Sequence, residues 1–273
     1  MTFPLRFLDG ETRLIGLIGD PVRQVRATWP LTEKLQAAGI NTLVMPMHVT
    51  SSGLDDFVAA MKAVSNVDGF IFTVPHKIAA LAFADQLSPL ARAAGSMNVL
   101  RREHDGLWLG HMLDGMGFVS GLKADGYEPA GMTVFIAGAG GVGSAIAASL
   151  ASAGASAFRL YDPDTSRARA LARRLARDWP AVSAVVLDTA DPAGADIAVN
   201  ATPLGMRPGD PLPFAVAETE PHALVAEVVM KPAVTRLIDE ARAAGRRVAL
   251  GENVLFHQLD LMTGFFAGEP LEG

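Results

Sequence analysis

Short apolar runs alternate with longer amphipathic stretches along most of the chain, and this alternation predicts an α/β fold with a parallel sheet. The strands expected in the first half cover residues 12–18, 42–49, 69–74 and, after a turn, the end of 94–100. The helices expected between them cover residues 29–38, 54–64 and a stretch that ends at Leu87. The strands expected in the second half cover residues 133–137, 157–161, 182–187, 196–200, 223–229 and 247–250. One helix is expected directly after the first of these strands. The other helices expected there cover residues 166–177, 233–244 and 253–266.

The stretch from Met132 to Asp162 carries the clearest signal for a ligand. An apolar strand runs into a glycine-rich turn and an alanine-rich helix, and the turn consists of Gly138, Ala139, Gly140, Gly141, Val142 and Gly143. Gly138 allows the tight turn, Gly140 lets the backbone approach a pyrophosphate, and Gly143 lets the helix pack on the strand. The helix N-terminus presents free N–H groups to phosphates. A tight turn without a ligand is the alternative, but the strand, helix and following acid together favour a dinucleotide site.

Composition narrows the function classes. A chain of 273 residues suggests one large domain or two smaller ones. The net charge of −6 and the lack of a basic tract argue against a nucleic-acid partner. The absence of cysteine excludes disulfides, thiolate metal sites and a cysteine nucleophile, and no two histidines have metal-ligand spacing, so no metal is expected. No apolar run is long enough to span a bilayer, and no signal peptide is recognised, so we expect a cytoplasmic protein without a membrane partner.

Two charged residues stand where expected strands end. Lys77 follows the strand at 69–74, and ligands of parallel sheets bind beyond the carboxyl ends of strands. Asp114 stands between a strand and a helix. A solvated lysine and a helix N-cap are the ordinary alternatives for these two residues. The segment Gly126–Gly131, which contains Pro129, is expected to be the hinge between two domains.

Six motifs together resemble the shikimate dehydrogenase family. They occur in the family's order between Gly19 and Gln258, and they are Val74-Pro75-His76-Lys77, Gly95-Ser96-Met97-Asn98, Asp114-Gly115-Met116-Gly117-Phe118, Gly138-Ala139-Gly140-Gly141, Asn200-Ala201-Thr202-Pro203-Leu204-Gly205-Met206 and Val254-Leu255-Phe256-His257-Gln258. The resemblance implies an α/β substrate domain made of residues 1–113 and 251–273, and a Rossmann domain made of residues 114–250, with a cleft between them. It also implies NAD(P)-dependent oxidation or reduction of a ring hydroxyl on shikimate, quinate or a related cyclic hydroxy acid. A homodimer is left open.

The resemblance also assigns roles to single residues. Lys77 and Asp114 would be the catalytic pair, and this is chemically sound because a lysine can transfer the hydroxyl proton if burial lowers its pKa or a neighbouring acid helps. The substrate would be bound by Thr73, Asn98 and Gln258. The nicotinamide side of the cofactor would lie at the loop that contains Thr202, Leu204 and Met206, because this loop follows a strand's carboxyl end. Without the resemblance, Asn98 and Gln258 would be read equally well as a turn amide and a helix-surface amide.

The chain departs from the family in its substrate loop. The family has a His-Ser-x-Ser-Pro pattern whose serines bind the substrate carboxylate, and Val25 and Ala27 stand in place of both serines. Neither side chain can donate a hydrogen bond to a carboxylate. Other positions that are polar in the family are also replaced here, by Ile71, Met112, Leu113 and Met230. Arg26 could take over the carboxylate as a bidentate partner, or it could be a solvated surface arginine.

These departures leave three readings of the substrate side. The substrate could still be shikimate or quinate, it could be a different hydroxylated acid, or activity on shikimate could be residual. A binding or regulatory protein that kept the nucleotide site is the alternative to an enzyme, and the retention of Lys77 and Asp114 favours the enzyme.

The acid after the second strand of the dinucleotide domain bears on the cofactor. NADP-dependent members of the family have Asn-Arg-Thr there, whereas this chain has Tyr161-Asp162-Pro163. Asp162 would accept hydrogen bonds from the adenosine ribose of NAD and repel a 2′-phosphate. Arg167 and Arg169 at the next helix could still reach such a phosphate. The sequence therefore predicts NAD as the preferred cofactor, with NADP as a second cofactor.

Overall fold

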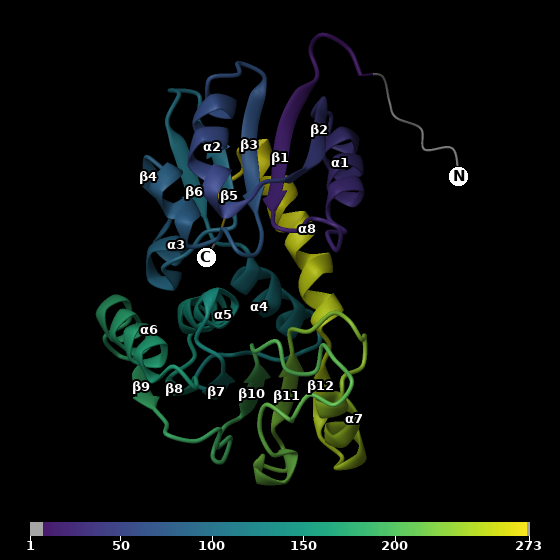
Figure 1. Cartoon of the computed structure of the whole chain (residues 1–273). Coiled ribbons are helices and arrows are strands. Elements are labelled where there is room, and N and C mark those ends of the chain that lie inside the picture. Colours follow the sequence, from purple (N-terminus) through teal and green to yellow (C-terminus); the bar gives the residue numbers. More distant parts are fainter. Residues whose placement is uncertain (1–7, 272–273) are drawn as a thin grey trace. The chain divides into compact units, whose positions relative to one another are not determined.

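The computed structural model describes residues 8–271, without the side chains of residues 253–256. The chain divides into two compact units, which Figure 1 shows with their elements labelled. The first unit contains the described residues up to Arg92, Ser96–Leu113, and the residues from Leu259 onward. The second unit contains Ala93–Gly95 and Asp114–Gln258. The expected hinge at Gly126–Gly131 lies inside the second unit, and the chain passes between units at Leu113–Asp114 instead.

The sheet of the first unit is mixed. Its strand order is β2-β1-β3-β5-β6-β4, and the strands are β1 (Arg13–Gly19), β2 (Thr42–His48), β3 (Val67–Phe72), β4 (Gln86–Leu87), β5 (Val99–Arg102) and β6 (Trp108–His111). β1 is parallel to β2 and β3, whereas β5 is antiparallel to both β3 and β6. A tight turn joins β5 to β6, with Glu103 N donating to Leu107 O at 2.7 Å. Strands joined by so short a turn must be antiparallel. The predicted α/β fold of this unit is confirmed, and β5 is the strand that runs antiparallel to its neighbours.

The first half of the chain forms α1 (Thr28–Ala37), η1 (Ser51–Gly53), α2 (Leu54–Lys62), η2 (Ala79–Phe83) and α3 (Pro89–Ala94). The helix expected to end at Leu87 is shorter than predicted: η2 is one 3-10 turn, and β4 follows it. The segment after η2 pairs with β6 instead of continuing as a helix. Asp85 N donates to Trp108 O at 2.9 Å, and Trp108 N donates to the Asp85 carboxylate at 2.8 Å. This reciprocal pairing satisfies the backbone groups that a longer helix would have used.

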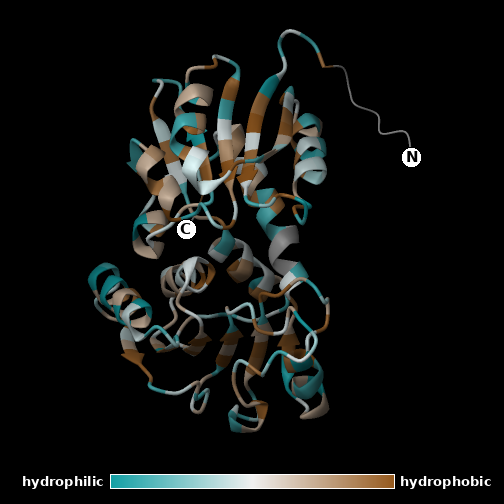
Figure 2. Cartoon of the chain, viewed as in Figure 1, coloured by the Kyte–Doolittle hydropathy of each residue, from teal (hydrophilic) through white to brown (hydrophobic). Residues whose placement is uncertain are grey.

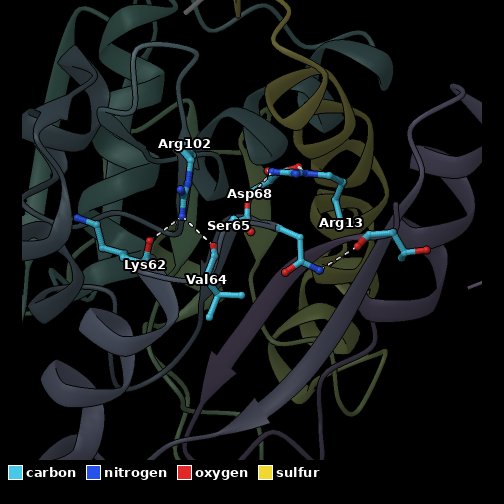
Figure 3. A network of polar contacts seen from close by, with 8 residues as sticks. Arg13, Lys62, Val64, Ser65, Asp68 and Arg102 are labelled. Carbon is cyan, nitrogen blue, oxygen red and sulfur yellow. Dashed lines mark hydrogen bonds and ion pairs between the residues drawn. The ribbon is translucent and has the colours of Figure 1, made fainter. Parts of the chain in front are cut away.

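The amino ends of β1 and β3 are closed by polar contacts (Figure 3). The Arg13 guanidinium pairs with Asp68, with its Nε 2.7 Å from Oδ2, and also donates to Ser65 O. The Arg102 guanidinium donates to Lys62 O and Val64 O at 2.7 and 3.1 Å. These arginines hold the loop after α2 against the sheet at the end opposite the carboxyl ends of β1 and β3.

The sheet of the second unit has the strand order of the dinucleotide-binding fold. The order is β12-β11-β10-β7-β8-β9, and the strands are β7 (Thr133–Ala137), β8 (Ala157–Tyr161), β9 (Ser183–Val186), β10 (Ile197–Asn200), β11 (Leu224–Glu227) and β12 (Arg247–Ala249). All neighbouring pairs are parallel. The strand order reverses between β7 and β10, and ligands of such sheets bind beyond the carboxyl ends at this switch point. The predicted Rossmann topology of this half is confirmed.

The remaining helices are α4 (Asp114–Ala124), α5 (Gly141–Ser152), α6 (Thr165–Asp178), η3 (Val216–Glu218), α7 (Arg236–Ala243) and α8 (Gly251–Ala267). In Figure 2 the strands are mainly apolar, while α6 and α7 carry polar residues on their outer faces. α6 buries Ala168, Leu171 and Leu175 in the core of the second unit. α6 and α7 begin at side-chain caps, where Asp164 accepts from Ser166 N and Thr235 accepts from Ile238 N. An apolar stripe and a cap therefore fix each helix on the sheet.

Candidate active site

The glycine turn after β7 is held tightly on one side and is open on the other. Gly138 has φ +100°, and a Cβ there would lie 2.8 Å from Ala201 O. A Cβ on Gly143 would lie 1.9 Å from Gly138 O, so α5 can approach the turn only without a side chain there. By contrast, a Cβ on Gly140 or Gly141 would meet nothing within 4 Å. Two glycines thus serve internal packing, and the other two border open space that suits the backbone approach of a pyrophosphate.

Asp162 is attached to this turn. It is 7% exposed, its Oδ2 accepts from Ala139 N at 2.7 Å, and its Oδ1 accepts from Asp164 N at 2.9 Å. Both oxygens therefore already bind backbone donors, and the carboxylate ties the glycine turn to the end of β8. Arg167 and Arg169 are exposed on the first turns of α6, where Arg167 pairs with Asp164 at 3.3 Å.

The loop after β10 is folded on itself and lies against the glycine turn. The Asn200 Oδ1 accepts from Thr202 N at 3.0 Å and from Thr202 Oγ1 at 2.7 Å. The Thr202 Oγ1 in turn accepts from Leu204 N at 3.1 Å. Met206 at the end of the loop is exposed. Because Ala201 O and the Thr202 methyl border Gly138, the predicted cofactor residues of both loops meet at the switch point.

Glu227, which the sequence analysis did not identify, binds Asn200 at the start of this loop. It is the last residue of β11 and is 1% exposed. Asn200 Nδ2 donates to both of its oxygens, at 2.9 and 3.1 Å. Burial raises the pKa of Glu227, and hydrogen bonds from Val229, Asn200, Thr235 and Val228 oppose that rise. The available signal was an acid at the end of an apolar strand, which resembles an ordinary strand terminus.

The predicted residues of the first unit lie at strand ends. Thr73 N donates to Ile18 O at 2.9 Å, directly after β3. Lys77 is half-buried in the turn that follows, and its carbonyl accepts from Met97 N at 2.9 Å. Asn98 is 1% exposed, and its Oδ1 accepts from Leu113 N at 2.7 Å. The backbone bond between residues 77 and 97 thus places the Lys77 turn next to the Asn98 segment.

Asp114 and Gln258 meet within the second unit although they are far apart in sequence. Asp114 is the first residue of α4, Gln258 lies on α8, and both are buried. The Gln258 Nε2 donates to the Asp114 Oδ1. The carboxylate is therefore oriented by the amide of the last helix. Lys77 belongs to the first unit, and its pairing with Asp114 stays a prediction.

The substituted loop before α1 has few polar contacts. Val25 is half-buried, Arg26 is exposed, and Ala27 is buried at the start of the helix. Ala27 has helical dihedral angles (φ −75°, ψ −22°), and no side chain caps α1. Ile71, Met112 and Leu113 are buried core residues of the first unit, and Met230 is exposed in the second. Three of the replaced polar positions thus contribute to packing.

Among the described titratable groups of the first unit, His111 has the pKa that lies furthest from its ordinary value. It ends β6 beside the ring of Phe265, with ring centroids 5.9 Å apart, and its Nδ1 accepts from Met112 N. Burial, with a smaller contribution from the positive charge of Arg101, lowers the pKa of His111 to about 4. The ring is therefore neutral near pH 7.

The described residues contain neither a metal-binding cluster nor a membrane-spanning helix. No group of three or more His, Asp or Glu side chains in that part of the chain could hold a metal ion. No described helix is long and apolar enough to cross a membrane.

Comparisons with known proteins identify the family to which this fold and these motifs belong. Residues 17–100 match the model of the shikimate dehydrogenase substrate binding domain. Shikimate dehydrogenase (NADP(+)) of Rubrobacter xylanophilus is 38% identical over 92% of this chain and 89% of that protein. The structure of shikimate 5-dehydrogenase from Listeria monocytogenes with shikimate and NAD has TM-score 0.89 and 26% identity, covering 99% of this chain and 96% of that one. Ligand-free 5-ketofructose reductase of Gluconobacter sp. has TM-score 0.85 and 30% identity, covering 96% and 95%. The predicted resemblance is confirmed: the chain belongs to the shikimate dehydrogenase family of NAD(P)-dependent oxidoreductases that act on CH–OH groups.

Proposed function

We propose that the protein catalyses reversible hydride transfer between NAD(P) and a ring hydroxyl of a cyclic hydroxy acid of the shikimate or quinate type. The observation that carries this proposal is the meeting of the glycine turn and the Asn200–Met206 loop at the switch point of the second sheet. The bound nicotinamide supplies the hydride chemistry. The chain's own residues must then bind the substrate, orient it and move one proton.

Lys77 and Asp114 are the proposed proton-transfer pair. In the oxidation, Lys77 Nζ takes the hydroxyl proton, and in the reduction it returns a proton to the carbonyl oxygen. Asp114, which Gln258 orients, binds the same or an adjacent hydroxyl and stabilises the ammonium form. Well-placed acid–base help of this kind contributes ~10²–10⁴-fold in rate. Thr73 and Asn98 are the proposed hydroxyl-binding residues of the first unit.

NADP is better supported as a cofactor than the sequence alone suggested. The prediction of NAD rested on Asp162, and both of its oxygens accept backbone N–H groups. Exposed Arg167 and Arg169 remain to receive a 2′-phosphate, and the Rubrobacter relative is named for NADP(+). We therefore expect NADP to be used at least as well as NAD.

An uncharged polyol ketone is the second candidate substrate class. Val25 and Ala27 provide no side-chain donor for a carboxylate, and the 5-ketofructose reductase whose fold is similar is named for a substrate without one. Buried donors matter here because a carboxylate that loses its partners binds much more weakly. If Arg26 supplies the missing charge, the acid substrate stays favoured, and if it is only a solvated arginine, the neutral substrate does.

One assay separates these candidates. The absorbance of the reduced nicotinamide is followed with NAD and NADP against shikimate and quinate, and with NADH and NADPH against 5-ketofructose. Turnover that Lys77→Ala lowers by ~10²-fold or more, and that the exposed-lysine control Lys123→Ala leaves unchanged, supports the proposed pair. Turnover on the ketose alone selects the neutral class. Silence on all three with intact NADP binding would favour the binding or regulatory role.

A further inference from the structure

The Glu227 carboxylate is surrounded by donors. Val228 N and Val229 N donate to its Oε1 at 2.8 and 2.9 Å, and Thr235 Oγ1 donates to its Oε2 at 2.8 Å. Asn200 Nδ2 reaches both oxygens. Every hydrogen bond that the described residues form with this side chain is donated to it, which is the arrangement an ionised carboxylate requires. Keeping a carboxylate 1% exposed costs free energy unless such partners are present.

The same contacts extend into the loop after β10. Asn200 Nδ2 also donates to Leu204 O at 2.9 Å, while its Oδ1 holds Thr202. On the other side, the Thr235 side chain packs on Gly205, where a Cβ would lie 3.3 Å from Thr235 Cβ and φ is +101°. Glu227 therefore holds two residues, Asn200 and Thr235, that restrain opposite ends of the loop from 201 to 205.

We infer that Glu227 is a positioning residue, which through Asn200 and Thr235 fixes the 201–206 loop in the conformation that receives the nicotinamide half of the dinucleotide. This inference rests on the proposed function, because that function assigns the loop to the nicotinamide. The adenine half would be held elsewhere, by the glycine turn and the start of α6. Glu227 has no contact with that turn among the hydrogen bonds described, so its loss should affect the two halves of the cofactor unequally.

The test compares binding of the whole dinucleotide with binding of its adenine half. Glu227→Gln keeps the shape of the side chain but replaces one acceptor with a donor. The control is Glu220→Gln, since Glu220 accepts one surface bond from Gly194 N. By calorimetry, we expect Glu227→Gln to weaken NADP binding about 10-fold, while the affinity for 2′,5′-ADP stays within about twofold. Where turnover is measurable, kcat should fall as well, because a small misplacement of the reacting ring is costly.

The outcomes separate this inference from the proposed function. Equal weakening of NADP and 2′,5′-ADP would mean a general structural role and would overturn the inference, as would no change in either. Failure of the unaltered protein to bind NADP or NAD would overturn the proposed function itself. If Glu227→Gln does not fold, Glu227→Asp carries the same comparison, because it keeps the charge and retracts it by one methylene group.

Discussion

Two loops at the carboxyl ends of strands, one in each unit, are held in very different ways. The segment before α1 is held at its start by Asp20, whose N donates to Val74 O and whose Oδ1 lies 2.6 Å from His48 Nε2. Beyond Asp20 it has one bond from the Gln24 side chain to Pro21 O and one from Val25 N to Val22 O. The loop after β10 is crossed by hydrogen bonds of Asn200 and Thr202 and is supported by Glu227. The comparison teaches that the loop on the cofactor side is fixed by buried hydrogen bonds, while the two replaced serine positions, Val25 and Ala27, lie in a segment with few contacts. Substitutions in such a segment cost little stability, so substrate choice can change without loss of the fold.

The largest effect on stability and cofactor binding should come from adding a side chain beside the glycine turn of the second unit. Gly143→Ala places a Cβ 1.9 Å from Gly138 O, and we expect it to cost about 3 kcal/mol or more of stability and to abolish dinucleotide binding. Gly141→Ala is the matched control for stability, because its Cβ meets no protein atom within 4 Å. Urea unfolding of both variants measures the difference in stability, and NADP calorimetry on Gly143→Ala and the unaltered protein measures the loss of binding. Equal stability of the two would show that α5 can move away from the turn.

The next largest effect should be on the pH dependence of stability, to which His111 in the first unit and Glu227 in the second contribute with opposite sign. The folded His111 pKa of about 4 lies below the ordinary 6.5, so the unfolded state binds more protons between these values. The first unit should therefore lose stability as pH falls from 6.5 to 4, by at most about 3 kcal/mol. The pKa of Glu227 is raised above 4.5, so its contribution is instead lost as pH rises through the raised value.

Hydrogen exchange of peptides covering β6 and β11 at several pH values measures both signs. His111→Phe should remove most of the acid sensitivity around β6 and leave that around β11 unchanged. A first unit equally stable at pH 6.5 and 4 would contradict the role given to His111.

Placing serines at positions 25 and 27 should increase the preference for a carboxylated substrate over a neutral one. Val25→Ser with Ala27→Ser returns two donors to the segment before α1, and we expect kcat/KM for shikimate to rise about 10-fold relative to that for 5-ketofructose. Arg26→Ala in the unaltered chain is the companion variant. An unchanged KM for every carboxylated substrate in that variant would remove Arg26 from substrate binding.

The smallest effect concerns stability at the start of α1. A serine at position 27 would stand on helical backbone, whereas a capping serine needs an extended conformation. We expect Ala27→Ser alone to change the free energy of unfolding by less than about 0.5 kcal/mol. Thermal unfolding checks this, and a larger gain would mean that the backbone rearranges to form a cap.

The elements that could be predicted from the sequence are those whose signal is local. The glycine spacing from Gly138 to Gly143 needs a strand before it and a helix after it, and both are present. The antiparallel pairing of β5 with β6 has a local cause as well, since Asp105-Gly106 is a hairpin signal between these two short strands. Reading that dipeptide as a turn would have predicted the mixed sheet.

The rest depends on contacts between distant residues, which no window of sequence contains. Gln258 donates to Asp114 across 144 positions, and Glu227 binds Asn200 across 27. Asp162 was correctly placed at the end of a strand, yet its oxygens turned out to bind the backbone. Burial and partners, unlike residue type, are set by the assembled sheet.

The division of α8 between the units has a consequence for synthesis on the ribosome. The first unit takes its strands from the beginning of the chain but needs Leu259 and the residues after it to be complete. The second unit is nearly continuous in sequence and can close once Gln258 has left the exit tunnel. Domains usually fold in the order in which they are translated. Here the part that is translated first is finished last, so its apolar sheet must wait, partly uncovered, while the nucleotide-binding part is made.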